Sequence, residues 1–551
     1  MSSRFRTLAL HAGLLSAFVV PAGVTDMYPK NPGIDALNYA YTLELSDTTD
    51  RITGELALDL RFVSAGVRSI RLDLINASAA QGGKGMTVSA VMLNGAPATY
   101  THRSDELLVP LTATPAANSR TRLVVRYHGT PITGLKIGNN KHGDRTFFSD
   151  NWPDKARHWL PSIDHPYDKA TSEFIVTAPN HYQVVSNGLQ VELTDVPGGR
   201  RRTHWKNSVP IAPWLYVLGA ARFAMQRVDT FEGKAIETWV YPQDRDAGFA
   251  DFATPTKSAL AFYTDYVGPF AYERLANIQS NSVSGGMEAA SAILYSEGSV
   301  TGTKSVRWRN VVIHEIAHQW FGNAVTESDW DDVWLSEGFA TYFTLLYIEH
   351  AYGRDEFLQG LASSRRSVMA YDSLHPNYTI VHDNLQRMED VTSSQTYQKG
   401  SWTLHMLRGV IGTEAFQRGI RSYYRNHFNG NATTADFRRE MEAASGRDLG
   451  WFFDQWLYKP GRLKLAGTWT WDAQAKAVRV ALEQVQSGGA LIRMPIDVAV
   501  YTAGQPTATM QRVDVSAKSQ TFTIPAASEP AEVRLDPNQW VLMEAALVRR
   551  R

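Results

Sequence analysis

The spacing of apolar residues changes twice along this chain, and this change most constrains its fold. Near the N-terminus Tyr39 and Tyr41, and later Leu56 and Leu58, alternate with smaller or polar residues, which is the period of a half-buried strand. From about residue 235 the apolar residues are spaced for helices, and after the turn sequence YKPGR the period returns to two. The order predicts a β region, a helical region and a second β region.

The length of the chain supports this division. Its 551 residues exceed the roughly 250 to 300 residues at which a single hydrophobic core stops growing. We therefore expect a multidomain α+β protein with an N-terminal antiparallel β domain, a mainly helical domain and a C-terminal β-sandwich. The expected bounds are 1–26 for a leader, 27–228 for the first domain, 229–460 for the second and 461–546 for the third.

Several helices are expected in the middle domain. The last of them has Thr433 or Thr434 as a candidate N-cap, with Asp436 in its first turn, an arrangement that satisfies free backbone N–H groups. The predicted helices span about 253–267, 304–321, 332–351, 395–411, 414–427 and 434–445.

Composition excludes several classes of function. The 55 Lys and Arg residues balance the 55 Asp and Glu residues, and the charge pattern lacks the uniform basic face of a nucleic-acid binder. We therefore expect no nucleic-acid partner. Cysteine is absent, which removes thiol nucleophiles, thiolate ligands and disulfides. Any bound metal has to be held by His and carboxylate.

The N-terminal residues have the order of a secretory signal peptide. Arg4 and Arg6 precede a short apolar run, which ends in Pro21, Ala22 and Gly23. The run is shorter than the roughly 20 residues of a membrane span, and no later segment approaches that length. We predict an exported protein, periplasmic or extracellular, without a membrane span in the mature chain. A buried N-terminal helix is the alternative.

The segment HEIAH, residues 314 to 318, is the strongest chemical signal. In a helix, residues four apart lie on one face, so His314 and His318 aim their imidazoles at one point. Two imidazoles are half of a tetrahedral zinc site. Without a further ligand, the pattern is equally typical of an amphipathic helix with two half-buried histidines.

A third ligand is available on the next predicted helix. Glu337 follows His318 after eighteen residues, and Gly338 beside it would allow a second helix to approach closely. Asp331 or Asp332 can cap this helix, and Gly322 is a stop signal for the preceding one. The set His, His and Glu leaves one zinc position open, as catalytic zinc requires.

Glu315 then has a role as a general base. Zinc lowers the pKa of water to about 7, and a carboxylate beside that water can take its proton as the water attacks a carbonyl. Glu315 lies between the two histidines and is turned about 100° from them around the helix axis. We expect Glu315 to face the cleft and not to bind the metal. The metal is expected to be one zinc ion per chain.

The pattern HExxH, eighteen residues and then Glu within LSEGFATYF resembles the aminopeptidase N-like zinc metallopeptidases, which include the leukotriene hydrolases. Further similarity is found at QWFGN, GGMEAAS and YQKG, and the resemblance runs from about residue 35 to 460. It implies that the middle domain is a thermolysin-like catalytic domain.

The resemblance also implies two substrate contacts. The strand Gly285, Gly286, Met287 and Glu288 would receive the substrate backbone, and Glu288 would bind the free α-ammonium group, so that only the first peptide bond is presented for cleavage. A blocked N-terminus would leave this carboxylate unpaired, at a cost of roughly 1 to 3 kcal/mol. Tyr397 would donate its phenol proton to the oxyanion.

This sequence departs from the family pattern at two places. Ala289 follows Glu288 where the family usually has Asn, so one hydrogen bond is lost. The second amine-binding Glu or Gln of many members has no clear counterpart, because the alignment brings Trp152 near that position, with Asp150 and Asn151 adjacent. These differences affect the expected geometry of the subsites more than the expected reaction.

The leading hypothesis is a zinc aminopeptidase that hydrolyses the N-terminal residue from peptides. One alternative is a zinc endopeptidase that does not use Glu288 as an amine anchor. Another is a peptide-binding module with a vestigial site, which the intact set of metal ligands, base and Tyr397 argues against. The preferred N-terminal residue and the oligomeric state do not follow from the sequence.

Overall fold

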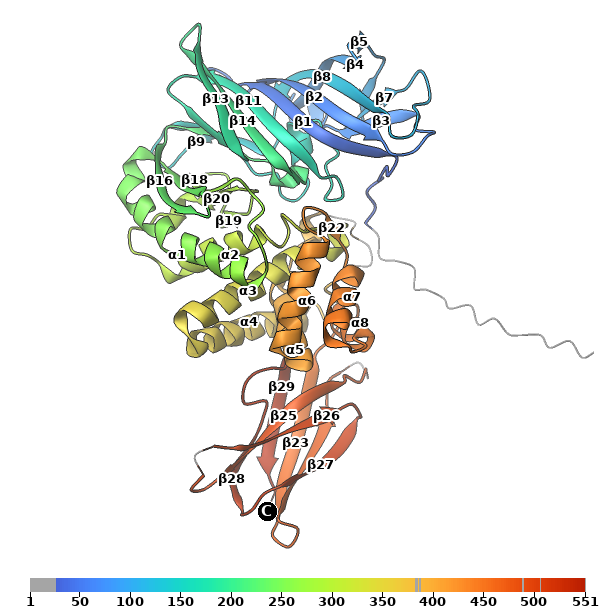
Figure 1. The fold of residues 1–551 in the computed structure, drawn as a ribbon, viewed down its shortest axis with the longest axis vertical. Coiled ribbons are helices and arrows are strands. Elements are labelled where there is room, and N and C mark those ends of the chain that lie inside the picture. The colour runs from blue at the N-terminus through green and yellow to red at the C-terminus, as the bar shows by residue number, and fades with distance from the viewer. Residues whose placement is uncertain (1–25, 382–384, 386–387, 488–489, 506, 551) are drawn as a thin grey trace, which may run out of the picture.

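A computed structural model describes residues 26–550 apart from 382–384, 386–387, 488–489 and 506. Figure 1 shows a β-rich N-terminal region, a mainly helical middle region and C-terminal strands, stacked along the long axis. The predicted fold class is therefore confirmed, while the domain bounds stay predictions. The predicted signal peptide lies almost wholly outside the described residues.

The N-terminal region is built on a large twisted sheet. Its alternating pattern is confirmed, because Tyr39, Tyr41, Leu56 and Leu58 are all fully buried. One neighbouring pair is parallel, β1 with β11, which differs from the purely antiparallel domain expected. The eight strands, in sheet order, are β13 (Leu189–Val196), β14 (Arg200–Ile211), β11 (Ala170–Pro179), β1 (Ile34–Glu44), β2 (Ile52–Phe62), β8 (Arg120–Thr130), β4 (Gly85–Leu93) and β5 (Ala96–Pro97).

Two smaller sheets complete this region. The four-stranded sheet is β12 (Gln183–Ser186), β15 (Leu218–Ala221), β10 (Arg145–Ser149) and β9 (Leu135–Asn139), and the three-stranded sheet is β3 (Ser69–Asp73), β7 (Glu106–Pro110) and β6 (Thr101–Arg103). The four-stranded sheet matters for the site, because the segment that follows β10 lines the cleft.

The middle region begins with a five-stranded mixed sheet, on which the helices pack. In sheet order its strands are β16 (Ala224–Phe231), β17 (Lys234–Val240), β18 (Arg274–Ser280), β20 (Ala292–Ser296) and β19 (Gly286–Met287). The short β19 is an edge strand, antiparallel to β20. A two-residue pair, β21 (Thr326–Glu327) with β22 (Asn431–Ala432), links distant parts of the region.

The helices follow the predicted order, with additions. Those of the middle region are α1 (Arg245–Tyr266), α2 (Val306–His318), α3 (Trp334–Tyr352), α4 (Arg354–Leu374), α5 (Gly400–Ile411), α6 (Thr413–Asn426), α7 (Thr434–Ser445) and α8 (Gly450–Leu457). Thr433 caps α7 in a reciprocal arrangement with Asp436, so this predicted cap is confirmed. The sequence interpretation missed α4 and α8, and it began α1 eight residues too late.

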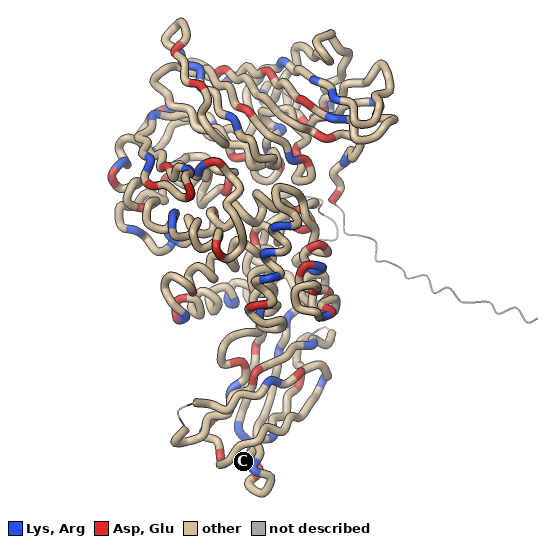
Figure 2. Tube along the Cα trace, in the orientation of Figure 1, with Lys and Arg blue, Asp and Glu red and all other residues tan. Residues whose placement is uncertain are grey.

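The C-terminal region consists of two packed sheets. Their strands are β27 (Ser519–Pro525), β24 (Ala477–Gln484), β23 (Leu463–Asp472) and β29 (Met543–Arg549) in one sheet, and β26 (Thr509–Val515), β25 (Met494–Thr502) and β28 (Pro530–Leu535) in the other. Val478 and Val480 are fully buried, as the alternating pattern predicts. Figure 2 shows acidic and basic residues interspersed in all three regions. In the described part of the chain, no helix is long and apolar enough to span a membrane.

Candidate metal and catalytic centre

Helix α2 presents His314 and His318 on one face, as the spacing predicts. Their rings lie 4.7 Å apart between centroids and nearly perpendicular to each other. The two Nε2 atoms are 3.1 Å apart. Both histidines therefore direct the same nitrogen to one point.

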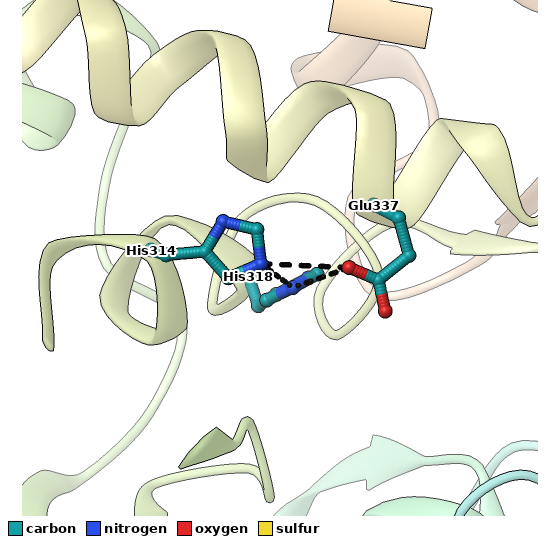
Figure 3. Close-up of side chains that lie close together, drawn as sticks. All are labelled: His314, His318 and Glu337. Atoms are coloured by element: carbon teal, nitrogen blue, oxygen red, sulfur yellow. Dashed lines mark hydrogen bonds and ion pairs between the residues drawn. The ribbon is translucent and has the colours of Figure 1, made fainter. Parts of the chain in front are cut away.

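Helix α3 brings Glu337 to the same point (Figure 3). Its Oε2 atom lies 3.4 Å from His314 Nε2 and 3.3 Å from His318 Nε2. Ligands at about 2.0 to 2.1 Å from a tetrahedral ion are about 3.3 Å apart. Burial opposes ionisation of Glu337, but the two histidines outweigh it and lower its pKa to about 2. The three residues fit a divalent cation.

The ring of His318 is held in a metal-binding orientation. Its Nδ1 atom lies 3.1 Å from the carbonyl oxygen of Phe321 and 3.0 Å from Ser336 Oγ. Since a carbonyl only accepts, Nδ1 carries the proton and the Nε2 lone pair stays free for a metal. Gly322 follows with φ of 106°, and a Cβ there would lie 2.2 Å from Ser336 Oγ. The helix ends at His318, three residues before the predicted end.

The start of α3 differs from the prediction in its cap. Asp332 accepts hydrogen bonds from the hydroxyl and backbone N–H of Thr434, and no side chain caps α3. The role predicted for Gly338 is supported, because a Cβ there would lie 3.0 Å from Gly400 Cα. Helices α3 and α5 therefore approach with backbone against backbone directly beside Glu337.

Glu315 lies on the side of α2 that faces β19. Its carboxylate is within 4.8 Å of ligand-type atoms of Glu288 and His318. A Cβ on Gly286 would be 2.2 Å from Glu315 Oε1, whereas one on Gly285 would meet nothing within 4 Å. The absence of a side chain thus has a different effect at each glycine. Gly286 makes room for Glu315, and Gly285 leaves the cleft open.

Glu288 follows β19 and reaches the same cavity. Its Oε1 atom is buried, with no hydrogen-bond partner among the described residues. Burial, only partly offset by His318, raises its pKa to about 7. A carboxylate in this state gains most from an incoming cation.

The backbone of Glu288 is supported by residues to which sequence reasoning gave no role. Gln319 Nε2 and Asn323 Nδ2 both donate to its carbonyl oxygen, at 3.0 and 2.7 Å. Lys169, from the N-terminal region, donates to the carbonyl oxygens of Asn323 and Ala324 at 2.9 and 3.0 Å. The motif QWFGN signalled the first two, whereas Lys169 had no local signal.

Tyr397 lies in a π-helix, Gln395–Lys399, immediately before α5. Its ring stacks on that of His314 with centroids 6.2 Å apart. Burial and the nearby carboxylates Glu337 and Glu288 raise its pKa well above 10, so the phenol keeps its proton. π-Helices are frequent at functional sites, and this one brings a proton donor beside a metal ligand.

Two cavities meet at these residues. One of about 460 Å³ is lined by β19 and by the segment after β10. The other, of about 790 Å³, extends between α2, α3 and α4. Glu288, Glu337 and Tyr397 line both cavities. A ligand that extends across the metal triad can therefore occupy both cavities.

The departures from the family pattern have structural correlates. Ala289 is buried. Asn151 is engaged within the protein, because it accepts from Trp159 Nε1 at 2.9 Å and donates to the carbonyl oxygen of Tyr216 at 2.8 Å. Trp152 packs edge-on against Trp214 and Trp330. Of the three residues near the second amine-binding position, these two are committed to packing and to hydrogen bonds with the protein.

Comparison with known families gives two matches. The Peptidase family M1 domain matches residues 253–456. The Peptidase M1 N-terminal domain matches residues 35–215. The two matches therefore cover both the metal triad and the region that supplies Lys169.

Individual relatives share the middle of this chain. Glutamyl aminopeptidase of Rattus norvegicus is 31% identical over 327 residues, which are 57% of this chain and 34% of that protein. Glutamyl aminopeptidase of Homo sapiens is 30% identical over 330 residues, again 57% and 34%. "Probable aminopeptidase 2" of Sulfurisphaera tokodaii is 30% identical over 319 residues, 56% and 40%. The matched segment spans about a third of the length of the first of these relatives.

Proposed function

Because the chain belongs to peptidase family M1, we propose that it is a zinc-dependent aminopeptidase that removes the N-terminal residue from peptides. The observation that most supports this is the position of Glu288, which lines the same cavity as the metal triad and whose Oε1 atom has no hydrogen-bond partner among the described residues. The names of the relatives, glutamyl aminopeptidase and aminopeptidase 2, agree with it.

One zinc ion per chain would be held by His314, His318 and Glu337, whose ligand atoms have the separations of a tetrahedral site. When bound, zinc supplies a Lewis acid that polarises the scissile carbonyl and lowers the pKa of water to about 7.

Two residues beside the triad transfer the proton and stabilise the negative charge that develops on the substrate. Glu315 accepts the proton of the attacking water and returns it to the leaving amine. Tyr397, which is kept protonated, donates a hydrogen bond to the carbonyl oxygen as negative charge develops there. Each of these side chains lies against the same cavity.

Glu288 defines the end of the substrate. Its carboxylate pairs with the α-ammonium group, and the fixed distance from Glu288 to the triad presents the first peptide bond for attack. An internal peptide segment would bury this carboxylate unpaired. This disfavours the endopeptidase alternative, and the relatives do not support a vestigial peptide-binding module.

The test is a comparison of a free peptide with its N-acetylated form, with and without a chelator. We expect cleavage of the free peptide only, loss of activity with the chelator and recovery on addition of zinc. Equal cleavage of both peptides would exclude aminopeptidase action.

We also propose export to the periplasm or the extracellular space. The support is the order of charged, apolar and small residues at 1–23. Mass spectrometry of the N-terminus of protein purified from the culture fractions tests this proposal, and an intact Met1 on a cytosolic protein would contradict it.

A further inference from the structure

The segment that carries Glu288 depends on backbone contacts for its position, because Ala289, the next residue, has no polar side chain. The carbonyl oxygen of Glu288 accepts from Gln319 Nε2 at 3.0 Å and from Asn323 Nδ2 at 2.7 Å. Gln319 Oε1 also accepts from the backbone N–H of Ser291 at 3.0 Å. A shift of the Asn323 side chain would therefore move the backbone from which the Glu288 carboxylate extends.

The loop that contains Asn323 is held from the N-terminal region by Lys169. This residue immediately precedes β11, and its Nζ atom donates three hydrogen bonds to the middle region. The acceptors are the carbonyl oxygens of Asn323, Ala324 and Gly430, at 2.9, 3.0 and 3.1 Å. One ammonium group thus joins the loop after α2, the segment before β22 and the N-terminal region.

These contacts require the charged form of Lys169. Burial lowers its pKa to about 7, and the Glu327 carboxylate partly offsets this effect. An ammonium group has three N–H donors, whereas a neutral amine has two and would leave one carbonyl oxygen without this donor. The three acceptors therefore match the ammonium group.

The residues after Glu288 have separate contacts with the N-terminal region. Asn187 Nδ2 donates to the carbonyl oxygen of Ala290 at 2.7 Å, and the N–H of Gly188 donates to Ser291 Oγ at 2.9 Å. These contacts remain when the lysine is changed. We therefore expect a change at the lysine to displace the Glu288 carbonyl without releasing the whole segment.

We propose that Lys169 is a positioning residue for the amine anchor: through the Asn323 loop, the N-terminal region sets the place of the Glu288 carboxylate relative to the metal triad. The inference rests on the proposed aminopeptidase function, in which Glu288 binds the α-ammonium group of the substrate. Among the described residues that line the two cavities at the triad, Lys169 is not found, so it acts on the substrate only through Glu288.

The first experiment measures peptide binding in the zinc-loaded Glu315→Gln background. Calorimetry compares Ala-Ala-Ala with its N-acetylated form, and the ratio of the two affinities reports the amine anchor. Lys169→Met removes the ammonium group and should lower this ratio about 2- to 10-fold, with zinc content unchanged. The carbonyl oxygens of Asn323 and Gly430 keep a second donor in Thr326, so the variant should fold.

A double-mutant cycle distinguishes positioning from general destabilisation. Glu288→Ala should bring the ratio to about one, and Lys169→Met should then change it by less than about twofold, because the lysine acts through the missing carboxylate. Lys141→Met is the matched control. Lys141 also joins the two regions, through Asp244 at 2.6 Å and the carbonyl oxygen of Glu297 at 3.4 Å, and its loss should leave the ratio of the parent protein within about twofold.

Two further variants test the same chain of contacts if Lys169→Met does not fold. Lys169→Gln keeps N–H donors on a shorter side chain and should lower the ratio less. Asn323→Asp places an acceptor against the Glu288 carbonyl oxygen and should lower it more. An unchanged ratio in the folded variants, or an equal loss for free and acetylated peptides, would overturn the inference. If Glu288→Ala itself left the ratio unchanged, the proposed function would fail and the inference with it.

Discussion

Two separate clusters of the described residues combine histidine with carboxylates, and only one of them is a credible metal centre; a third group, Glu288, Glu315 and His318, shares His318 with the first. The first is the metal triad of His314, His318 and Glu337. The second, here called the interdomain cluster, is formed by Asp26, His165 and Asp329. In each, the possible ligand atoms lie within 4.8 Å of one another, so proximity does not distinguish them.

The carboxylates of the interdomain cluster already have partners within the chain. Lys30 forms an ion pair with Asp329. His165 Nε2 lies 2.6 Å from Asp26 Oδ2, which also accepts from the backbone N–H of Trp330 at 3.2 Å.

The metal triad differs in its surroundings. Glu337 Oε2 is buried without a hydrogen-bond partner in the described part of the chain, and the triad lines a large cavity. The difference teaches that a candidate metal centre is marked by a buried acceptor that the protein leaves without a hydrogen bond and by a cavity beside it.

The largest expected effect is loss of a triad ligand. His318→Ala should reduce bound zinc from one per chain to near zero and lower kcat/KM by more than the roughly 10- to 100-fold typical of residues that only orient a ligand. Metal analysis and peptidase kinetics measure this. His165→Ala is the matched control and should retain one zinc; if both variants lost zinc equally, the comparison between clusters would fail.

Next in size is the change of Glu315, the proposed general base. Glu315→Gln should keep one zinc and bind peptides, while kcat falls roughly 10²- to 10⁴-fold because proton transfer is lost. Metal analysis with single-turnover kinetics separates the two properties. Retained turnover would show that another group takes the proton.

A smaller loss is expected from a change of Tyr397, the proposed proton donor. Tyr397→Phe removes one hydrogen bond to the developing oxyanion, worth about 2.7 to 4 kcal/mol of barrier, or roughly 10²- to 10³-fold in kcat. KM and zinc content should change little. A change confined to KM would indicate that Tyr397 contacts the ground state of the substrate instead.

The smallest effect belongs to the interdomain cluster. Asp26→Asn should cost about 1 to 3 kcal/mol of unfolding free energy at pH 7 and leave zinc content unchanged. Burial opposes ionisation, but the bond to His165 outweighs it and lowers the pKa of Asp26 to about 2. The stabilisation is therefore complete above the ordinary Asp pKa of about 3.9 and is lost as the pH falls toward 2.

Urea unfolding of the wild type and Asp26→Asn at pH 7, 5 and 3 measures this. The difference should be constant between pH 7 and 5 and smaller at pH 3. Asp35→Asn, which breaks an exposed pair with Arg61, is the control and should cost about 0 to 1 kcal/mol. A difference that grows toward pH 3 would contradict the assignment.

The parts that sequence predicted well depend on local spacing. His314 and His318 are one helical turn apart, so any helix there brings them together. The spacing of apolar residues, with the period of a strand or of a helix, likewise predicted the N-terminal β region, the helical middle region and the C-terminal β region. Helix α4 was missed because its buried face includes the polar residues Ser364 and Asp372, which interrupts the apolar pattern.

The parts that could not be predicted depend on contacts between distant residues. Asp332 binds Thr434, about a hundred residues further along, instead of capping the helix beside it. The support of the Asn323 loop by Lys169 joins two regions, and the hydrogen bond from Asn151 to Tyr216 joins distant parts of the N-terminal region. No local pattern records such pairings, because they are created only when distant segments of the chain pack together.

The contact of Gly338 with Gly400 has a consequence for the spacing of the whole centre. Gly338 adjoins the carboxylate ligand, and Gly400 begins the helix that follows the tyrosine segment. A methyl group on either glycine would push α3 and α5 apart. The distance between Glu337 and the Tyr397 segment therefore depends on the absence of a side chain at both positions, and it is set by a contact of backbone atoms rather than of side chains.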